Sequence, residues 1–154
     1  MLSKEARKER NVLFWTAFKE VMRKHVSSSG RRVNWIKYPT EVNHTYLRLI
    51  SDGKQTAVCY DIQFKDEGVQ AIFWEQLGEL KKVLEASIKH PTNWNESVIA
   101  SEGTHIARIS WELENVNFFK DEDWPIIHHF FKDRLIEFDS FYQEFKDILI
   151  SLVE

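Results

Sequence analysis

Residues Asp121 to Leu152, near the C-terminus, carry a long amphipathic pattern. From Ile127 onward, apolar side chains recur every three or four positions, and charged side chains fill the positions between them. This period is typical of an α-helix that buries one face. Pro125 fits the first turn of such a helix, because the N–H group that proline lacks has no partner there. The pattern therefore predicts one helix of about 30 residues, which is roughly 45 Å long.

A helix of this length spans a whole domain. A compact chain of 154 residues is only about 40 Å across. The aromatic stripe of the helix therefore needs a broad apolar surface opposite, which the middle of the chain must supply. Apolar residues make up 43% of the sequence and charged residues 29%, as in ordinary globular proteins. We therefore expect a single globular domain over residues 1–154.

Composition also bears on where the protein resides. No apolar run approaches the ~18 residues that a membrane helix needs, and residues 1–10 hold no apolar signal core. Cys59 is the single cysteine of the sequence, so it cannot form an internal disulfide. These features favour a cytoplasmic protein in a reducing compartment, with no membrane contact.

The remaining elements are predicted from shorter patterns. Helices are expected over residues 3–26 and from residue 66 to just before residue 90, and strands over residues 33–38, 45–51, 55–64, 94–99 and 104–113. Asp52-Gly53, between two β-rich runs, is typical of a hairpin turn. The order α-β-β-β-α-β-β-α predicts an α+β domain, in which three helices pack on a mainly antiparallel five-stranded sheet.

The hairpin turn also predicts which side chains share a face of the sheet. If Asp52 and Gly53 form the whole loop, Leu47 faces Val58 across the two strands. One face is then apolar and suits a helix; it holds Leu47, Leu49, Val58, Tyr60, Ile62 and Phe64. The other face is semi-polar and holds His44, Tyr46, Arg48, Ile50, Cys59, Asp61 and Gln63. The polar side chains of this second face are one candidate binding surface.

Positive charge is concentrated near the start of the chain. Residues 1–37 hold ten Lys/Arg against three Glu, whereas the remainder holds eleven against twenty-one Asp/Glu, within a net charge of -3. A serine-rich turn is bracketed by Arg23, Lys24, Arg31 and Arg32. Because such side chains neutralise phosphates, and nearby Trp35 and Tyr38 could stack on bases, the cluster predicts contact with nucleic acid. Alternatively, Trp35 is a core residue and the charges are a solvated helix end.

Five short blocks carry a resemblance to a known family. They are Phe14-Trp15-Thr16-Ala17-Phe18, Asn34-Trp35, Phe73-Trp74-Glu75-Gln76-Leu77, Arg108-Ile109 and Asp123-Trp124-Pro125. Their order and spacing, over nearly the whole chain, resemble the short, stand-alone form of the bacterial and archaeal domain-of-unknown-function family 4268. In longer relatives a similar domain follows a restriction-endonuclease-like module. The resemblance implies a link to DNA metabolism or defence, and it implies no catalytic residue because the family has no assigned chemistry.

A restriction-type nuclease is the enzymatic alternative. Such enzymes hold a metal between two acids beside a lysine on neighbouring strands. The nearest match here is Asp52 or Asp61 with Gln63-Phe64-Lys65, in which a glutamine replaces one acid. The six histidines show no metal-binding spacing, and Cys59 has no obvious basic neighbour that would lower its pKa. We therefore expect no catalytic residue, metal or cofactor.

Two structural alternatives remain open. Six tryptophans and eleven phenylalanines are many for one small core, so an aromatic strip on the C-terminal helix could cover a second copy in a homodimer. The competing interpretation is that the helices and the sheet bury all of them. A small-molecule pocket between the long helix and the sheet is a further alternative. The main prediction is a non-catalytic interaction module, accessory to a nucleic-acid-processing or defence system.

Overall fold

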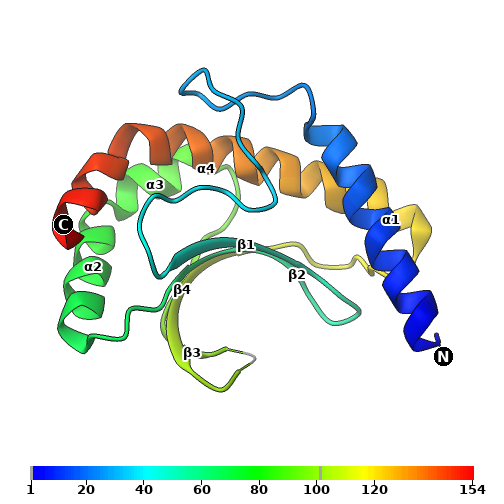
Figure 1. Cartoon of the computed structure of the whole chain (residues 1–154), viewed down its shortest axis with the longest axis horizontal. Coiled ribbons are helices and arrows are strands. Elements are labelled where there is room, and N and C mark those ends of the chain that lie inside the picture. The colour runs from blue at the N-terminus through cyan, green and yellow to red at the C-terminus, as the bar shows by residue number, and fades with distance from the viewer. Residues whose placement is uncertain (1, 101) are drawn as a thin grey trace.

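A long helix lies across an antiparallel sheet, as the computed structural model of the chain shows (Figure 1). The structure describes residues 2–100 and 102–154. Its elements are α1 (Lys4–Met22), β1 (Thr45–Ser51), β2 (Thr56–Ile62), α2 (Glu67–Glu79), α3 (Lys81–Ser87), β3 (Asn93–Ile99), β4 (His105–Glu112), a single 3-10 turn (Asp121–Asp123) and α4 (Trp124–Val153). The fold is therefore α+β, with the order α-β-β-α-α-β-β-α and the long helix last. Within these described residues, none of the helices has the length and apolarity that crossing a membrane requires.

The strand expected over residues 33–38 does not form, so the sheet built by the described residues has four strands, and the prediction of five is wrong. Asn34 is the physical reason, because its side-chain Oδ1 accepts hydrogen bonds from the amides of Ile36 and Lys37 at 3.1 and 3.3 Å. That local turn competes with a strand. Trp35 and Tyr38, three positions apart, are both buried, whereas a strand would bury alternate side chains. These residues instead belong to a long connection between α1 and β1.

The helix expected from residue 66 is interrupted, so residues 2–100 and 102–154 form four α-helices and the prediction of three is wrong. Leu80 leaves the helical conformation at φ −92° and ψ 4°, two residues after Gly78, which has a low helix propensity. The chain then turns into α3, whose Leu84 is fully buried. On either side of this break, α2 and α3 both contact α4.

The sheet has the strand order β1-β2-β4-β3, with every pair antiparallel. Leu47 pairs with Tyr60, whereas the two-residue loop predicts Val58. The register is thus shifted by two residues, and a shift of two leaves each side chain on its predicted face. Leu47 and Tyr60 are accordingly buried against α4.

The hairpin turn differs from the predicted one in the role of Asp52. Its backbone N–H donates to the carbonyl of Gln55, at 2.9 Å. Its side-chain Oδ1 accepts from the amides of Lys54 and Gln55, both at 2.7 Å. Asp52 therefore caps the turn with its side chain, and Gly53 and Lys54 form the tip, which moves the pairing by two residues.

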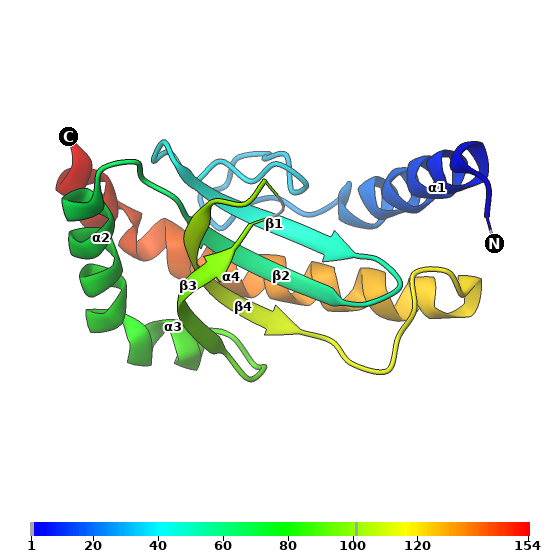
Figure 2. The same ribbon diagram turned by 90° about the horizontal axis from the view of Figure 1, so that it is seen from below.

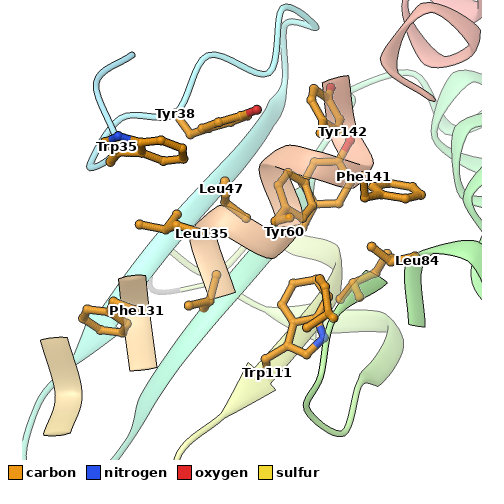
Figure 3. Packing of buried hydrophobic residues seen from close by; sticks show 14 of the residues in the cluster. Trp35, Tyr38, Leu47, Tyr60, Leu84, Trp111, Phe131, Leu135, Phe141 and Tyr142 are labelled. Atoms are coloured by element: carbon orange, nitrogen blue, oxygen red, sulfur yellow. The ribbon is translucent and has the colours of Figure 1, made fainter. Parts of the chain in front are cut away.

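Side chains of α4 fill the space above the sheet (Figure 3). The Phe138 ring stacks on Tyr142, with centroids 5.2 Å apart, and meets the edge of Tyr60 at 5.1 Å. Figure 3 also shows Trp111 of β4 and Leu135 of α4 in this layer. The buried aromatic stripe of α4 is thus used within one chain. This outcome supports the interpretation that competes with a homodimer, and the homodimer itself stays a prediction.

The helix α1 packs against the first turns of α4 through Phe14 and Phe18, which are fully buried. The His128 ring lies 4.5 Å from the Phe14 ring, and its Nε2 donates to the Phe14 carbonyl at 3.1 Å. His128 is only 7% exposed. Its neighbour His129 is exposed and contacts Asp133 at 3.1 Å. One histidine of the adjacent pair is therefore a core residue and the other a surface residue.

Burial lowers the pKa of His128 below its ordinary value of 6.5. The folded protein therefore keeps this imidazole neutral at pH values where the unfolded chain takes up a proton, so its contribution to stability is complete above pH 6.5 and decreases below it. We expect the urea midpoint of the wild type to fall between about pH 7 and 5.5. In His128→Gln, whose amide can still donate to Phe14, the fall should be smaller. A pH dependence in His128→Gln equal to that of the wild type would contradict this assignment.

Candidate functional site

Asp139 of α4 fixes the connection between α1 and β1. Its side chain is buried, at 2% exposed. Its Oδ1 accepts from the Ser27 hydroxyl at 2.8 Å and from the Tyr38 hydroxyl at 2.5 Å. Its Oδ2 accepts from the backbone N–H of Ser28 at 2.7 Å. Gln143, one turn further along α4, donates to the Tyr38 hydroxyl at 2.9 Å. A buried carboxylate thus ties two points of the connection, eleven residues apart, to one helix.

Between these two points the chain makes a tight turn. The N–H of Gly30 donates to the Ser27 carbonyl at 2.8 Å, and the N–H of Ser27 donates to the Arg31 carbonyl at 2.9 Å. Gly30 has a φ of +83°, in the left-handed region that a side chain would make unfavourable. The turn is therefore closed by its own backbone and held at its base by Asp139. Figure 1 shows it on the side of α4 that faces away from the sheet.

This turn displays the four predicted basic residues, which we name the basic loop: Arg23, Lys24, Arg31 and Arg32. All four are exposed. Arg32 Nη1 donates to the Arg23 carbonyl at 2.8 Å, which joins the two ends of the loop. Within the described part of the chain, Glu20 is the one carboxylate within 4 Å of these side chains, at 3.5 Å from Arg23. The acidic remainder of the chain therefore leaves most of this positive charge unpaired.

The two aromatic side chains near the basic loop are not available to stack on bases. Trp35 and Tyr38 are each 5% exposed, and Figure 3 shows both within the core. Trp35 Nε1 donates to the His25 carbonyl at 3.1 Å, so the indole supports the loop from inside. The interpretation of Trp35 as a core residue is confirmed. A shallow hollow of about 340 Å³, lined by Arg23, Arg32 and neighbouring side chains, remains on the surface.

The second predicted surface lies on the side of the sheet turned away from α4, which we name the outer face. The residues predicted for it are His44, Tyr46, Arg48, Asp61 and Gln63. Figure 1 shows that the sheet curves so that this face is concave. Among the described residues, no helix lies in front of it, although β3 crosses one end (Figure 2). The structure brings together Tyr46, Arg48, Asp61 and Gln63, while His44 lies at the rim.

Asp61 is the centre of the outer face and is fully buried. Arg108 contacts it with two donors, Nε to Oδ1 at 2.7 Å and Nη2 to Oδ2 at 2.9 Å. Arg48 Nη1 donates to Asp61 Oδ2 at 2.7 Å and to Gln63 Oε1 at 3.0 Å. The Arg48 guanidinium also lies over the Tyr46 ring, 4.5 Å from its centroid. Both arginines are therefore held in place at an otherwise open face.

Arg108 was not among the predicted site residues. It faces Asp61 because β2 pairs with β4, and it is the direct cross-strand partner of that residue. The two positions are 47 residues apart in sequence. The hydrogen bonds to Asp61 raise the pKa of Arg108. The alternation of β4 could have placed Arg108 on the outer face, but only the strand order brings it to Asp61.

The acids proposed for a nuclease site have other partners in the structure. Both carboxylate oxygens of Asp61 are engaged by arginines, and Asp52 caps the hairpin turn. Over residues 2–100 and 102–154, no three His, Cys, Asp or Glu side chains gather as a metal site would require. Cys59 lies beside Arg48 in the sheet, yet burial outweighs the arginines and raises the pKa of the thiol to about 12. The nuclease stays an alternative prediction.

A larger hollow, of about 590 Å³, opens at the end of the outer face. His44, Gln63 and Lys65 line one side of it, and Trp74 of α2 and His105 of β4 line the other. It thus lies between α2 and the strands, and not between α4 and the sheet, where the small-molecule alternative places a pocket. The middle of α4 packs on the sheet through the aromatic core. A further hollow of about 660 Å³ lies beside the last turns of α4, where Ile150, Leu152 and Val153 line it together with Phe64 and residues 41–44.

These features define an α+β domain with two cationic surfaces, one on each side of its long helix. The chain matches the family described as "Domain of unknown function (DUF4268)" over residues 11–146. This is most of its length, so the chain belongs to that family, and the resemblance noted in the sequence is confirmed. Searches of the curated proteins and of the solved structures gave no match.

If Asp139 holds the basic loop, its removal should loosen the loop and destabilise the protein. We expect Asp139→Ala to lower the free energy of unfolding by about 3 kcal/mol, because three donors lose a buried charged acceptor. Urea denaturation measures this change. Glu144→Ala, at an exposed position of the same helix, should change it by less than about 0.5 kcal/mol.

Limited proteolysis provides the local measurement for the same pair of variants. Trypsin cleaves after lysine and arginine, so it reports directly on the basic loop. Cleavage after Lys24, Arg31 or Arg32 should be faster in Asp139→Ala than in Glu144→Ala. Equal cleavage rates in the two variants would contradict the role assigned to Asp139.

Proposed function

We propose that this protein is a non-catalytic interaction module that binds the phosphate backbone of nucleic acid through the basic loop. One observation carries this proposal. Four exposed basic side chains are gathered on a turn that a buried carboxylate fixes to the main helix, and among the described residues Glu20 is the one carboxylate within 4 Å of them. Lysine and arginine that neutralise phosphates release condensed counterions, which supplies most of the free energy of non-specific binding.

The fixed shape of the turn supports binding in a second way. A loop that is already ordered loses little conformational entropy when a ligand binds, so more of each contact appears as affinity. Ser27 and Gly30 close this turn through backbone hydrogen bonds, and Asp139 anchors it. The cationic side chains thus extend from a rigid base, in contrast to a charged tail that must order upon binding.

The buried aromatic residues narrow the type of recognition. Because Trp35 and Tyr38 belong to the core, the basic loop offers charges and no stacking surface. Contacts to phosphates position a protein on nucleic acid but carry no sequence information. We therefore expect sequence-independent binding, with dissociation constants of roughly 10⁻⁴ to 10⁻⁶ M at physiological salt. Such a module would act as an accessory to a nucleic-acid-processing or defence system, in agreement with the implication of the family resemblance.

A gel-shift or fluorescence-anisotropy titration with duplex DNA tests the proposal. We expect Lys24→Ala/Arg31→Ala to bind DNA about tenfold more weakly than the wild type at low salt. The slope of log K against log salt concentration should be smaller in magnitude by about 2. This pair is preferred because Arg32 also supports the loop through the Arg23 carbonyl. The matched control is Lys82→Ala/Lys89→Ala, which removes the same charge from exposed positions outside the loop.

Two results would remove this function. One is the absence of binding to DNA or RNA by the wild type at low salt. The other is an equal loss of affinity in the loop variant and in the control variant, which would attribute binding to overall charge. Both variants should unfold at the wild-type urea concentration, since the substituted side chains are exposed.

A further inference from the structure

The outer face presents two guanidinium groups, each of which uses some of its donors for protein acceptors of the described residues. Arg108 uses Nε and Nη2 for Asp61, and Arg48 uses one nitrogen, Nη1, for Asp61 and Gln63. Among the described residues, Arg108 Nη1 and Arg48 Nη2 form no hydrogen bond with a protein group. The side chains of Arg48 and Arg108 keep 36% and 20% of their surface exposed, whereas that of Asp61 keeps none. The carboxylate is therefore hidden beneath two partly exposed cations.

The charge balance of this cluster is positive. One carboxylate, Asp61, faces two guanidinium groups, which leaves a surplus of one charge. In the row of cross-strand partners that contains Asp61 and Arg108, the flanking residues are Tyr46 and Asn95, both uncharged. Glu112 influences Arg108 electrostatically, but it forms no ion pair within 4 Å of it in the described structure. The surplus charge is thus not cancelled locally.

Neutralising Asp61 does not require the second arginine. A buried carboxylate needs a cation and enough donors to compensate for the loss of water. Arg108 supplies the cation and two of the donors, because it makes a bidentate contact with the two carboxylate oxygens of Asp61. Arg48 adds a third hydrogen bond and the surplus charge. Buried ion pairs contribute little to stability, so the arrangement is better explained by the orientation that Asp61 imposes on two arginines.

We propose that the outer face of the sheet binds a phosphate group between Arg48 and Arg108. Two guanidiniums on different strands can each donate to different oxygens of a tetrahedral phosphate, whereas one guanidinium already satisfies a planar carboxylate. Asp61 and the Tyr46 ring hold the two cations before the ligand arrives, which is the preorganisation that anion sites need. The phosphate is part of a phosphomonoester or of a nucleic-acid backbone, and the experiment below distinguishes these sources.

This site is separate from the basic loop and does not rest on the function proposed for that loop. The loop lies on the side of α4 that faces away from the sheet, and the outer face is turned the opposite way (Figures 1 and 2). A substitution at one surface should therefore leave binding at the other unchanged.

The test is an NMR titration with inorganic phosphate at constant ionic strength, observed at the arginine Nε–Hε signals and the amides of β1, β2 and β4. We expect saturable shifts at Arg48 and Arg108 in the wild type. Arg48→Gln should bind phosphate at least about tenfold more weakly, because it removes one of the two cations. Arg108 keeps its paired contact with Asp61 in this variant, so the fold should be retained. Arg48→Lys keeps the positive charge but loses the planar set of donors of the guanidinium, so it should weaken binding about threefold.

Two further probes identify the source of the phosphate. Adenosine monophosphate represents phosphomonoesters, and a short single-stranded oligonucleotide without terminal phosphates represents the backbone. If adenosine monophosphate binds more tightly, as judged from the Arg48 and Arg108 signals, the site is assigned to phosphorylated small molecules. If the oligonucleotide binds more tightly, the site is assigned to nucleic acid. Either result supports the proposal, because both place a phosphate at Arg48 and Arg108.

Three results would overturn the proposal. The first is the absence of saturable shifts at Arg48 and Arg108 with all three probes. The second is wild-type affinity in Arg48→Gln or, if that variant does not fold, in Arg48→Lys. The third is an equal loss in Lys24→Ala/Arg31→Ala, which would show that phosphate follows overall charge. The failure of this site would leave DNA binding by the basic loop intact, so the two proposals are tested independently.

Discussion

Contact between the buried stripe of α4 and the apolar face of the sheet determines the arrangement of everything else. Phe138 and Tyr142 of the helix meet Tyr60 of β2 at ring distances of 5.1 to 5.9 Å, and these rings are fully buried. Burying one such side chain contributes about 1.5–3 kcal/mol. Because this layer covers one face of the sheet, the helices of the described residues leave the opposite face open (Figures 1 and 2). The connection between α1 and β1 must likewise lie along the free side of the helix, where Asp139 receives it.

Two buried carboxylates share a structural role in this fold. Asp139 accepts only uncharged donors, from Ser27, Ser28 and Tyr38, and thereby fixes the backbone that carries the basic loop. Asp61 accepts from two guanidiniums and fixes these cations directly. In each case an acid that is removed from water determines where positive charge is presented. The negative net charge of -3 therefore says little about ligands, because screening limits the reach of surface charges to about 8 Å at physiological salt.

The sequence could predict those features that depend on local periodicity. The long helix, the hairpin strands and their two faces follow from patterns with periods of 3.6 and 2, and all are present. Prediction failed where side chains compete with the backbone. Asn34 converts a β-like run into a turn, and Asp52 caps the hairpin and shifts its register by two residues. The basic residues could be identified because they are close in sequence. Arg108 could not, since its position beside Asp61 depends on the pairing of β2 with β4.

The separation of the two cationic surfaces follows from the same layered arrangement. The basic loop extends from the solvent side of α4, and Arg48 and Arg108 lie on the far side of the sheet (Figures 1 and 2). A surface that binds extended nucleic acid benefits from several cations along one face, because each phosphate contact adds to affinity. Two surfaces that point in opposite directions cannot combine in this way on one rigid duplex. This arrangement is the reason for proposing non-specific contact with a backbone at the basic loop and a single phosphate group at the outer face, where one acid fixes two cations.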